Sequence, residues 1–295
     1  MKRILITGAN SYVGTSFEKY AKLHYPTEFI IDTVDMIDGS WREKDFSGYD
    51  VVYHVAGIAH ADVGKVTEEQ KKLYYAVNTD LAIETAKKAK EDGVRQFIFM
   101  SSIIIYGDSA PYGKKKRISL ETVPEPSNFY GDSKWKADQG IRKLWDEKFK
   151  VCILRPPMIY GRGCKGNYQV LSRLAKKLPV FPDVENERSM LYIENLCEFL
   201  CQIIIKEDEG IYFPQNKEYV KTSDLVKMIA EVNGRRIIVS KLFNWVVWLG
   251  SILPGRIGCL VNKAFGNLTY EKSLTQYNSI YNFSCFENSI IETEK

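Results

Sequence analysis

The first residues of the chain constrain its fold more than any other segment. An apolar run over 2–7 leads into Thr7–Gly14, a turn that contains two glycines, and apolar side chains at helical spacing follow over 13–23. Glycines permit a tight turn and close packing of helix on strand, and the helix N-terminus offers N–H groups to a phosphate. This strand–turn–helix order predicts a dinucleotide-binding loop at the edge of a parallel sheet.

The same alternation continues along the chain. Further strands are expected at 29–34, 50–56, 95–101 and 151–155, and helices at 67–91 and from about 129. The later half is less regular, with helices expected at 167–177, 194–205 and 222–233 and short strands at 189–193, 210–213 and 236–239. Strands that alternate with helices imply right-handed crossovers, so we expect an α/β fold with a doubly wound parallel sheet of the Rossmann type.

Composition and charge exclude several classes of protein. The 295 residues carry a net charge of +4, which does not indicate nucleic-acid binding but is compatible with an anionic small-molecule substrate. The six cysteines form no Cys-x-x-Cys pair and have no histidine near them in sequence, so no metal site is expected. A reduced, cytoplasmic protein is the interpretation that we favour, and the N-terminus indicates a first strand and not a signal peptide.

One apolar segment, from Leu242 to Val261, needs separate treatment. It contains Trp245 and Trp248, but Pro254, Arg256 and three glycines make it a poor membrane-spanning helix. We therefore expect no integral membrane segment and a hydrophobic surface or lid over these residues. Peripheral contact with a membrane is the alternative.

The chemistry is indicated by a tyrosine and a lysine that are four residues apart. Tyr130 and Lys134 share one face of the expected helix, and an ammonium close to a phenol favours the phenolate and lowers its pKa. Such a pair can take or give a hydroxyl proton. Ser102, upstream in a segment that ends at Gly107, is the expected third member. The three predicted catalytic residues are Ser102, Tyr130 and Lys134.

The end of the second strand bears on cofactor choice. Asp32 and Asp35 lie where an acidic residue holds the adenosine ribose, and no arginine follows them closely, which favours NAD over NADP. Only about 15 residues separate Asp35 from the next strand, too few for a long helix. We infer that a strand–helix unit is missing here and that Asp35 and Met36 act on the adenine side.

Together these motifs resemble extended short-chain dehydrogenases of the nucleotide-sugar epimerase/dehydratase type, in particular a UDP-glucose 4-epimerase-like subgroup, from Ile4 to about Asn195. The middle position of the family's Gly-x-x-Gly-x-x-Gly loop departs from the pattern, because Ser11 stands there. The resemblance implies an NAD-binding domain over 1–158 plus 187–213. It also implies a smaller C-terminal α/β substrate-binding domain over 159–186 plus 214–295.

The resemblance also implies the site residues. The expected cofactor contacts are Gly8, Asn10, Ser11, Tyr12, Val13, Gly14, Asp32, Asp35, Met36, Val55, Ala56, Gly57, Asn78, Ser101, Tyr130, Lys134 and Pro157. The expected substrate contacts are Ser102, Ile103, Tyr130, Lys165, Asn167 and Arg188. An arginine fork suits phosphate oxygens, which is why Arg188 is expected on the diphosphate. His54 is expected to be a core histidine, and His60 is not expected to be catalytic.

The function that the resemblance implies is a 4-epimerase of a UDP-hexose-type nucleotide sugar, acting by transient hydride transfer with NAD, as a homodimer. An NAD(P)H-dependent 4-keto-reductase of a UDP-deoxysugar in surface polysaccharide synthesis stays open as the alternative. A dehydratase is disfavoured because Ile103, Ile104 and Ile105 follow Ser102 where such enzymes carry an acidic pair. A cofactor-sensing binding protein is the non-enzyme alternative.

Overall fold

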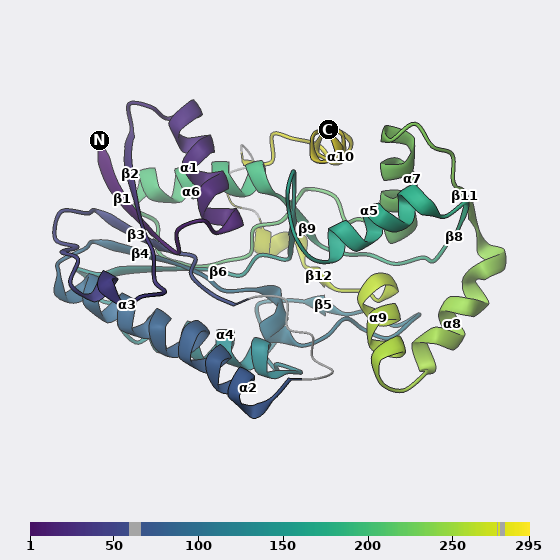
Figure 1. Ribbon diagram of the computed structural model, residues 1–295, viewed down its shortest axis with the longest axis horizontal. Coiled ribbons are helices and arrows are strands. Elements are labelled where there is room, and N and C mark those ends of the chain that lie inside the picture. Colours follow the sequence, from purple (N-terminus) through teal and green to yellow (C-terminus); the bar gives the residue numbers. More distant parts are fainter. Residues whose placement is uncertain (59–65, 276, 278–280) are drawn as a thin grey trace. The chain divides into compact units, whose positions relative to one another are not determined.

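A computed structural model describes residues 1–58, 66–275, 277 and 281–295 of the chain (Figure 1). Its contacts divide the chain into two compact units. The first unit holds Met1–Gly107, Pro124–Pro156 and Leu196–Pro214, and the second holds Asp108–Val123, Pro157–Asn195 and Gln215–Lys295. These ranges differ from the predicted domain ranges mainly over 108–123 and 187–195. The predicted domains themselves stay a prediction.

The first unit is built on a six-stranded sheet in the order β10-β6-β4-β3-β1-β2. Its strands are β1 (Lys2–Thr7), β2 (Phe29–Val34), β3 (Val51–His54), β4 (Gln96–Met100), β6 (Lys150–Leu154) and β10 (Gly210–Tyr212). All neighbouring strands pair in parallel. The predicted α/β fold with a Rossmann-type parallel sheet is thus confirmed.

Helices cover both faces of this sheet, which is why its central strands are mostly apolar. In Figure 1, α1 (Tyr12–His24) and α6 (Ile193–Lys206) lie on one face, and α3 (Leu81–Glu91) and α4 (Phe129–Arg142) lie on the other. Every residue of β3 and β4 is buried. Small residues of α3 and α4, such as Ala86 and Ala137, pack in the core against Phe97 and Phe99 of β4.

Two departures from a regular doubly wound sheet affect the site. Between β2 and β3 the chain forms only the short 3₁₀ turn η1 (Ser40–Arg42), and β2 is the edge strand, as the predicted missing strand–helix unit requires. The helix expected over 67–91 is interrupted. It consists of α2 (Glu68–Tyr75), the π-helical turn η2 (Ala76–Asp80) and α3. Sequence periodicity does not distinguish a π turn from regular helix.

The second unit combines helices with three two-stranded parallel pairs. Its helices are α5 (Asn167–Lys177), α7 (Thr222–Val232), α8 (Asn244–Ile252), α9 (Arg256–Phe265) and α10 (Phe286–Glu294). The pairs are β5 (Arg117–Ile118) with β12 (Thr269–Tyr270), β7 (Met158–Tyr160) with β9 (Met190–Tyr192), and β8 (Val180–Pro182) with β11 (Ile238–Ser240). The remaining 3₁₀ turns are η3 (Ile103–Tyr106), η4 (Lys241–Phe243) and η5 (Lys272–Thr275). Among the described residues, no helix is both long and apolar enough to span a membrane.

Candidate active site

The glycine loop after β1 is packed against the end of β3. Gly8 has a φ of +104°, and a Cβ there would lie 2.8 Å from the backbone nitrogen of Ala56. A Cβ on Gly14 would lie 3.1 Å from side-chain atoms of both Ile6 and Val55. Only glycine therefore lets the loop and the start of α1 approach the sheet this closely. The strand order reverses between β1 and β3, and ligands of such sheets bind at the carboxyl ends of the strands at this point.

Ser11, the departure from the family pattern, has a clear local role. It is the N-cap of α1, and its Oγ accepts a hydrogen bond of 3.2 Å from the backbone N–H of Gly14. Its backbone, with φ −68° and ψ 143°, is an extended conformation that needs no glycine. Asn10 beside it has a φ of 64°, which asparagine tolerates better than most residues. Tyr12 and Val13 form the first turn of α1.

The two acidic candidates on the adenosine side lie in different environments. Asp32 is within β2, where its carboxylate accepts a 2.9 Å hydrogen bond from the hydroxyl of Tyr49 and lies 3.6 Å from Arg3. Asp35 follows the carboxyl end of β2, is exposed and accepts a hydrogen bond from the backbone N–H of Ile37. The side chain of Met36 is buried in the core. Of the three, Asp35 has the position that a ribose contact requires.

The π turn η2 places Asn78 at the end of β3. Its Oδ1 accepts from the backbone N–H of Ile58 at 2.8 Å, and its Nδ2 donates to the carbonyl of Ile58 and to the hydroxyl of Ser133 on α4. Asn78 is fully buried, and a buried side-chain amide without hydrogen-bond partners would cost free energy. These bonds provide its partners. A π turn redirects side chains within a helix and is common at functional sites. Asn78 thereby connects the segment after Gly57 to the helix that carries Tyr130.

The segment of Ser102 and the start of α4 are in direct contact. Ser102 follows β4 and caps η3, with its Oγ accepting from the N–H of Ile104 at 3.3 Å. A Cβ on Gly131 would lie 2.9 Å from the carbonyl oxygen of Ile104. Glycine is therefore needed next to Tyr130 for α4 to begin against this segment. Sequence reasoning selected Tyr130 but did not identify a reason for Gly131.

Lys134 lies one turn after Tyr130 on α4 and is buried. Its Nζ donates a 3.0 Å hydrogen bond to the carbonyl oxygen of Met100 at the end of β4. A Cβ on Gly57, after β3, would lie 3.1 Å from the same Nζ and 3.0 Å from Oδ1 of Asn78. The structure thus brings Lys134, Asn78 and Gly57 together at the carboxyl ends of β3 and β4.

The acid–base properties differ from the expectation that Lys134 lowers the pKa of Tyr130. Burial, with a smaller contribution from the neighbouring Tyr74, raises the pKa of Tyr130 to about 12. Burial also lowers the pKa of Lys134 to about 8. The expectation was wrong for the free protein, because desolvation dominates the pKa of both groups. At neutral pH the phenol is protonated and the amine carries its charge.

A buried ion pair attaches α4, the helix of Tyr130 and Lys134, to the segment after β6, and sequence reasoning missed it. Arg155 donates to Asp138 of α4 at 2.9 Å and to the hydroxyl of Tyr106 at 2.7 Å. The hydroxyl of Ser101 also donates to Asp138, at 3.1 Å. The predicted cofactor contact of Ser101 therefore does not involve a free hydroxyl. Pro157, the other predicted contact on this side, is buried.

His54 was expected to be a satisfied core histidine, and this holds for one of its two nitrogens. Its Nδ1 lies 2.7 Å from the hydroxyl of Thr7, but its buried Nε2 has no partner among the described residues. Burial, together with the charge of Lys134, lowers the pKa of His54 to about 3. It is therefore neutral beneath the site. His60 lies outside the described residues.

In the second unit, Arg188 has neutral partners. Its Nη1 donates to the carbonyl oxygen of Gly266 at 2.9 Å and to the hydroxyl of Ser109 at 3.2 Å. No carboxylate among the described residues forms an ion pair with it. Burial without a counter-charge lowers its pKa to about 10. A guanidinium of this kind is suited to a phosphate or another anion.

The other two predicted substrate residues lie at the start of α5. Asn167 is the first residue of this helix, and both it and Lys165 are exposed. No contact recorded between described side chains joins them to Arg188. Ile103 is buried at the start of η3 in the first unit.

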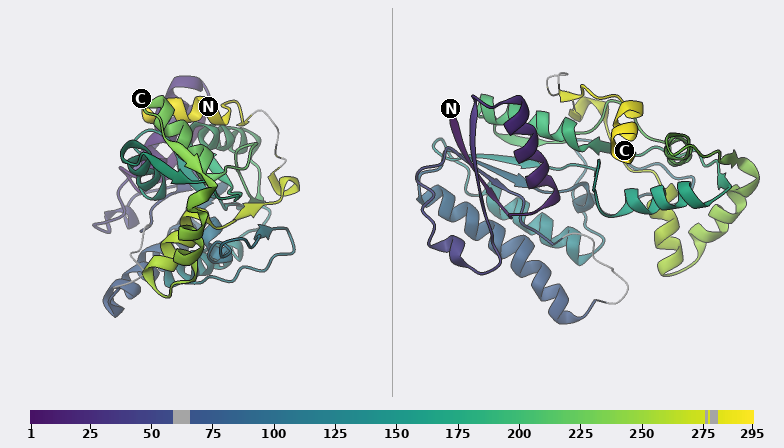
Figure 2. Two further views of the ribbon diagram at one scale, coloured as in Figure 1. Left: turned by 90° about the vertical axis from the view of Figure 1, so that its right-hand side faces the viewer. Right: turned by 45° about the horizontal axis from the view of Figure 1, so that its top comes forward.

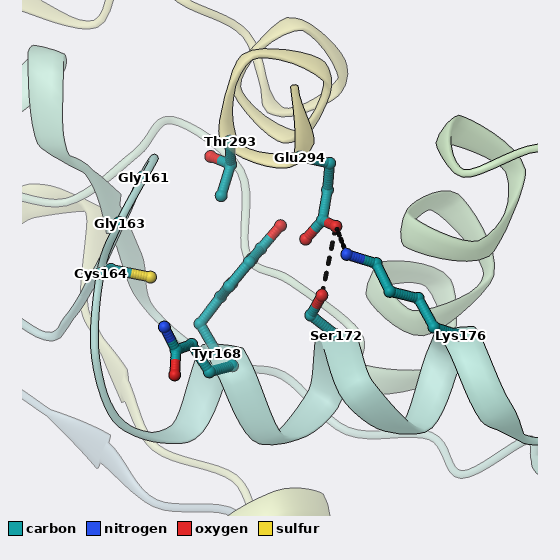
Figure 3. A pocket seen from close by; sticks show the side chains of 9 residues that line it. Gly161, Gly163, Cys164, Tyr168, Ser172, Lys176, Thr293 and Glu294 are labelled. Atoms are coloured by element: carbon teal, nitrogen blue, oxygen red, sulfur yellow. Dashed lines mark hydrogen bonds and ion pairs between the residues drawn. The ribbon is translucent and has the colours of Figure 1, made fainter.

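Beside these residues the second unit has a hollow of about 170 Å³ (Figure 3). It is lined by Gly161, Gly163, Cys164, Tyr168, Gln169, Ser172, Lys176, Thr293 and Glu294. Glu294 of α10 accepts from Lys176 at 2.8 Å and from Ser172 at 3.2 Å, as the dashed lines show. The contacts that attach α10 to α5 thus form one wall of the hollow.

The first unit fits a nicotinamide dinucleotide. Gly8 and Gly57 have no room for a Cβ at the carboxyl ends of β1 and β3, so the backbone lies bare there, beside the N-terminus of α1 and the carboxyl end of β2. When bound, such a cofactor supplies hydride chemistry. The chain's own groups supply a protonated phenol, a buried ammonium and the hydroxyl of Ser102. Groups of these kinds can orient a hydroxyl or carbonyl of a substrate and move its proton.

Comparison with known proteins agrees with this chemistry. The sequence profile described as the NAD dependent epimerase/dehydratase family matches residues 4–213. The chain is 32% identical over 251 residues to UDP-glucose 4-epimerase of Vibrio cholerae, covering 78% of this chain and 75% of that protein. It is 28% identical over 216 residues to N-acetyl-alpha-D-glucosaminyl-diphospho-ditrans,octacis-undecaprenol 4-epimerase of Escherichia coli O157:H7, covering 67% of this chain and 61% of that protein.

Solved structures share the fold at low sequence identity. UDP-glucose 4-epimerase of Thermus thermophilus, in complex with NAD, superposes with a TM-score of 0.72 at 18% identity over 99% of this chain and 97% of that chain. The dTDP-4-dehydrorhamnose reductase of Bacillus anthracis, in complex with NADP, gives 0.68 at 20% identity over the same shares. On the match of the family profile and the identity to the epimerase of Vibrio cholerae, the chain belongs to the NAD-dependent epimerase/dehydratase family, and it is an NAD(P)-dependent enzyme of the short-chain dehydrogenase type.

Proposed function

We propose that this enzyme is an NAD-dependent 4-epimerase of a UDP-hexose-type nucleotide sugar. The observation that carries the proposal is the position of Lys134, whose Nζ is held between the carbonyl of Met100 and Gly57 on the helix that also carries Tyr130. The similarity to the 4-epimerase of Vibrio cholerae supports this substrate class. In the proposal, Ser102, Tyr130 and Lys134 are the catalytic residues.

Each residue has one task in the proposed reaction. Ser102 donates a hydrogen bond to the sugar oxygen at C4 and orients it. Tyr130 first has to lose the proton that it carries in the free protein. Its phenolate then takes the proton of that hydroxyl when the sugar is oxidised and returns it when the keto-sugar is reduced on its other face. Lys134 supplies the positive charge that the phenolate requires. Arg188, which has neutral partners, binds the diphosphate.

The preference for NAD has support in the segment after β2. Arg42 is the first arginine after Asp35, and it forms a bidentate ion pair with Glu84 at 2.5 and 2.7 Å. Its guanidinium also stacks on the ring of Trp41, at 4.6 Å from the ring centroid. An arginine engaged in this way does not offer its fork to a 2′-phosphate. Asp35, in contrast, is exposed beyond the end of β2.

The experiment that tests the proposal is identification of the dinucleotide that the purified protein releases on denaturation. We expect near-stoichiometric NAD, followed by interconversion of UDP-glucose and UDP-galactose without added cofactor. Reversible binding of NADPH or NADH, with consumption of the reduced form on a 4-keto-sugar nucleotide, would replace the epimerase with the keto-reductase. Absence of any bound dinucleotide and of affinity for one would overturn both.

The homodimer stays part of the proposal. The helices that would pair are α4 and the helical stretch from α2 to α3. Light scattering at several protein concentrations tests this, and a monomer at all of them would contradict it. A cytoplasmic location and a role in surface polysaccharide synthesis are proposed on the substrate class alone.

A further inference from the structure

The apolar segment that the sequence singled out forms an exposed surface on α8 and α9. Of the 23 large hydrophobic residues that are exposed among those described, ten lie between 242 and 260. They are Leu242, Phe243, Trp245, Val246, Trp248, Leu249, Ile252, Leu253, Ile257 and Leu260. Single exposed apolar residues are normal, but a cluster of this size marks an interaction site. We refer to these ten residues as the α8–α9 surface.

The hairpin does not need these side chains for its own packing. α8 and α9 pack on each other (Figures 1 and 2), and a Cβ on Gly250 would lie 3.0 Å from Val261 on the facing helix. Val247 is the buried residue of α8. By contrast, Trp245 and Trp248 are 64% and 53% exposed. The apolar side chains therefore face away from the contacts that form the hairpin.

The charges around this surface have one sign. Between Glu231 and Glu271 the sequence contains no acidic residue but five basic ones, Arg235, Arg236, Lys241, Arg256 and Lys263. Arg235, Arg236 and Lys241 are exposed. Asp183 lies near Lys241, but its carboxylate is already bound by Lys221 at 2.8 Å. Any partner of the α8–α9 surface therefore has to be negatively charged at its edge.

A second basic segment is attached to the same hairpin. The loop that holds Lys114 and Lys115, for which catalysis has no use, is hydrogen-bonded to the end of α9. The backbone N–H of Tyr112 donates to Asn262 at 3.2 Å, and Asn267 donates to the carbonyl oxygen of Lys114 at 2.7 Å. Both lysines are exposed. Basic residues thus lie beside the apolar cluster in two separate segments of the chain.

The occupant follows from shape and charge. α8 has nine residues and is about 14 Å long, less than half of the ~30 Å hydrocarbon core, so the hairpin does not cross a bilayer. Two copies of the surface facing each other would bring cations of the same sign together. Tryptophan with leucine and isoleucine, flanked by lysine and arginine, is the composition of segments that lie in the interface of anionic membranes.

We propose that the α8–α9 surface docks this enzyme on an anionic phospholipid bilayer, with the apolar side chains in the headgroup region and Lys114, Lys115 and Lys241 on lipid phosphates. This proposal is independent of the proposed reaction, because none of these residues belongs to the catalytic groups of the first unit. It replaces the expectation of a lid with the alternative of peripheral membrane contact.

The experiment is vesicle flotation with the full chain. The probe is phosphatidylcholine vesicles with and without phosphatidylglycerol. We expect the wild-type protein to float with the anionic vesicles only, and less so at high salt. We expect the double variants Trp245→Ser/Trp248→Ser and Lys114→Glu/Lys115→Glu each to weaken this binding by about tenfold or more, since each basic residue near the surface contributes about 1 kcal/mol.

Matched controls distinguish binding through the α8–α9 surface from nonspecific adsorption of the protein to vesicles. Leu23→Ser removes an exposed leucine of α1, and Lys143→Glu/Lys148→Glu reverses two exposed lysines of the first unit. Both should float as the wild type does. Equal loss in the controls, or no flotation of the wild type, overturns the proposal. A concentration-dependent dimer that Trp245→Ser/Trp248→Ser abolishes, without vesicle binding, would assign the surface to a second copy instead. A circular-dichroism melt checks that each variant is folded.

Discussion

The ammonium of Lys134 donates a 3.0 Å hydrogen bond to the carbonyl oxygen of Met100, so a buried cation is fixed at the end of β4 by a neutral group. No carboxylate among the described residues pairs with it. Burial of this charge costs free energy, and it is the reason that the pKa of Lys134 falls to about 8. The site therefore holds its positive charge in place at the expense of stability.

This cost predicts a pH dependence of folding. Lysine in the unfolded chain keeps its proton to about pH 10.4, whereas Lys134 in the folded protein loses it near pH 8. Between these values the unfolded state binds more protons, so this residue makes the free energy of unfolding rise with pH. We expect Lys134→Met to remove that rise. The measurement is denaturant unfolding from pH 7 to 10, and Lys143→Met, at an exposed position, is the control. Parallel curves for wild type and Lys134→Met would contradict the prediction.

Tyr130→Phe should remove turnover while leaving dinucleotide binding intact. The ring and its contact with Tyr74, at 6.2 Å between centroids, are kept, and only the hydroxyl that moves the proton is lost. Loss of a general acid–base group typically costs about 10²–10⁴-fold in rate. Tyr74→Phe is the matched control and should retain turnover within about tenfold. The measurements are product formation and dinucleotide titration on the same preparations. Unchanged turnover in Tyr130→Phe would remove the central assignment.

Gly8→Ala should weaken dinucleotide binding as well as folding. Its φ of +104° strains any residue with a Cβ, and that Cβ would meet the backbone nitrogen of Ala56 at 2.8 Å. Gly93→Ala separates backbone strain from steric contact, because Gly93 has a φ of +80° but no atom within 4 Å of the added Cβ. We expect about 1–2 kcal/mol of destabilisation from strain in Gly93→Ala and more in Gly8→Ala. Equal losses in both variants would show that the close approach is unimportant.

Arg188→Gln should raise the KM for a nucleotide sugar with a smaller effect on kcat. The guanidinium has only neutral partners among the described residues, so its charge is available to an anion. A charge-assisted hydrogen bond contributes about 1.5–3 kcal/mol, which corresponds to more than tenfold in KM. Arg117→Gln, which removes an exposed arginine paired with Glu187 at 3.4 Å, is the control. Equal KM values for Arg188→Gln and wild type would remove Arg188 from the substrate site.

Glu294→Gln should change how the C-terminal helix responds to acid. Burial alone would raise the pKa of Glu294, but hydrogen bonds from Lys176, Asn233 and Ser172 bring it below its ordinary value. A carboxyl with a lowered pKa stabilises the fold above the unfolded value and loses that contribution as pH falls through the folded value. We therefore expect part of the acid sensitivity below about pH 4.5 to disappear in Glu294→Gln. Glu292→Gln, in an exposed pair with Lys295, is the control, and unfolding curves at pH 3 to 7 are the measurement.

Local sequence patterns were sufficient to predict an element where its apolar side chains are also the ones that pack against neighbouring elements. The helix expected at 167–177 is α5 (Asn167–Lys177), because its apolar residues Tyr168, Leu171 and Ala175 recur at helical spacing and all three are buried. The strand expected at 29–34 is β2, although only Phe29 of it is buried. The short segment after Asp35 also allowed the inference that no long helix follows this strand, and the structure has only η1 there.

Patterns failed where a contact between distant segments decides the outcome. The π turn around Asn78 depends on its bonds to Ile58 and Ser133, which are far away in sequence. The pKa of Tyr130 depends on burial and on the neighbouring Tyr74, and neither can be read from a spacing of four residues. The ion pair of Asp138 with Arg155 is likewise visible only once α4 lies on β6.

The interleaving of the two units has a consequence for synthesis of the chain. Five strands of the sheet are complete at Leu154, but the sixth, β10, is made only at Gly210–Tyr212, after the segment Pro157–Asn195 of the other unit. During synthesis on the ribosome, β6 therefore stays unpaired on one side, as a temporary sheet edge, while more than fifty residues are added. An open edge of this kind pairs readily with other chains, so delayed closure by β10 leaves the nascent chain exposed to wrong strand pairing until that strand is made.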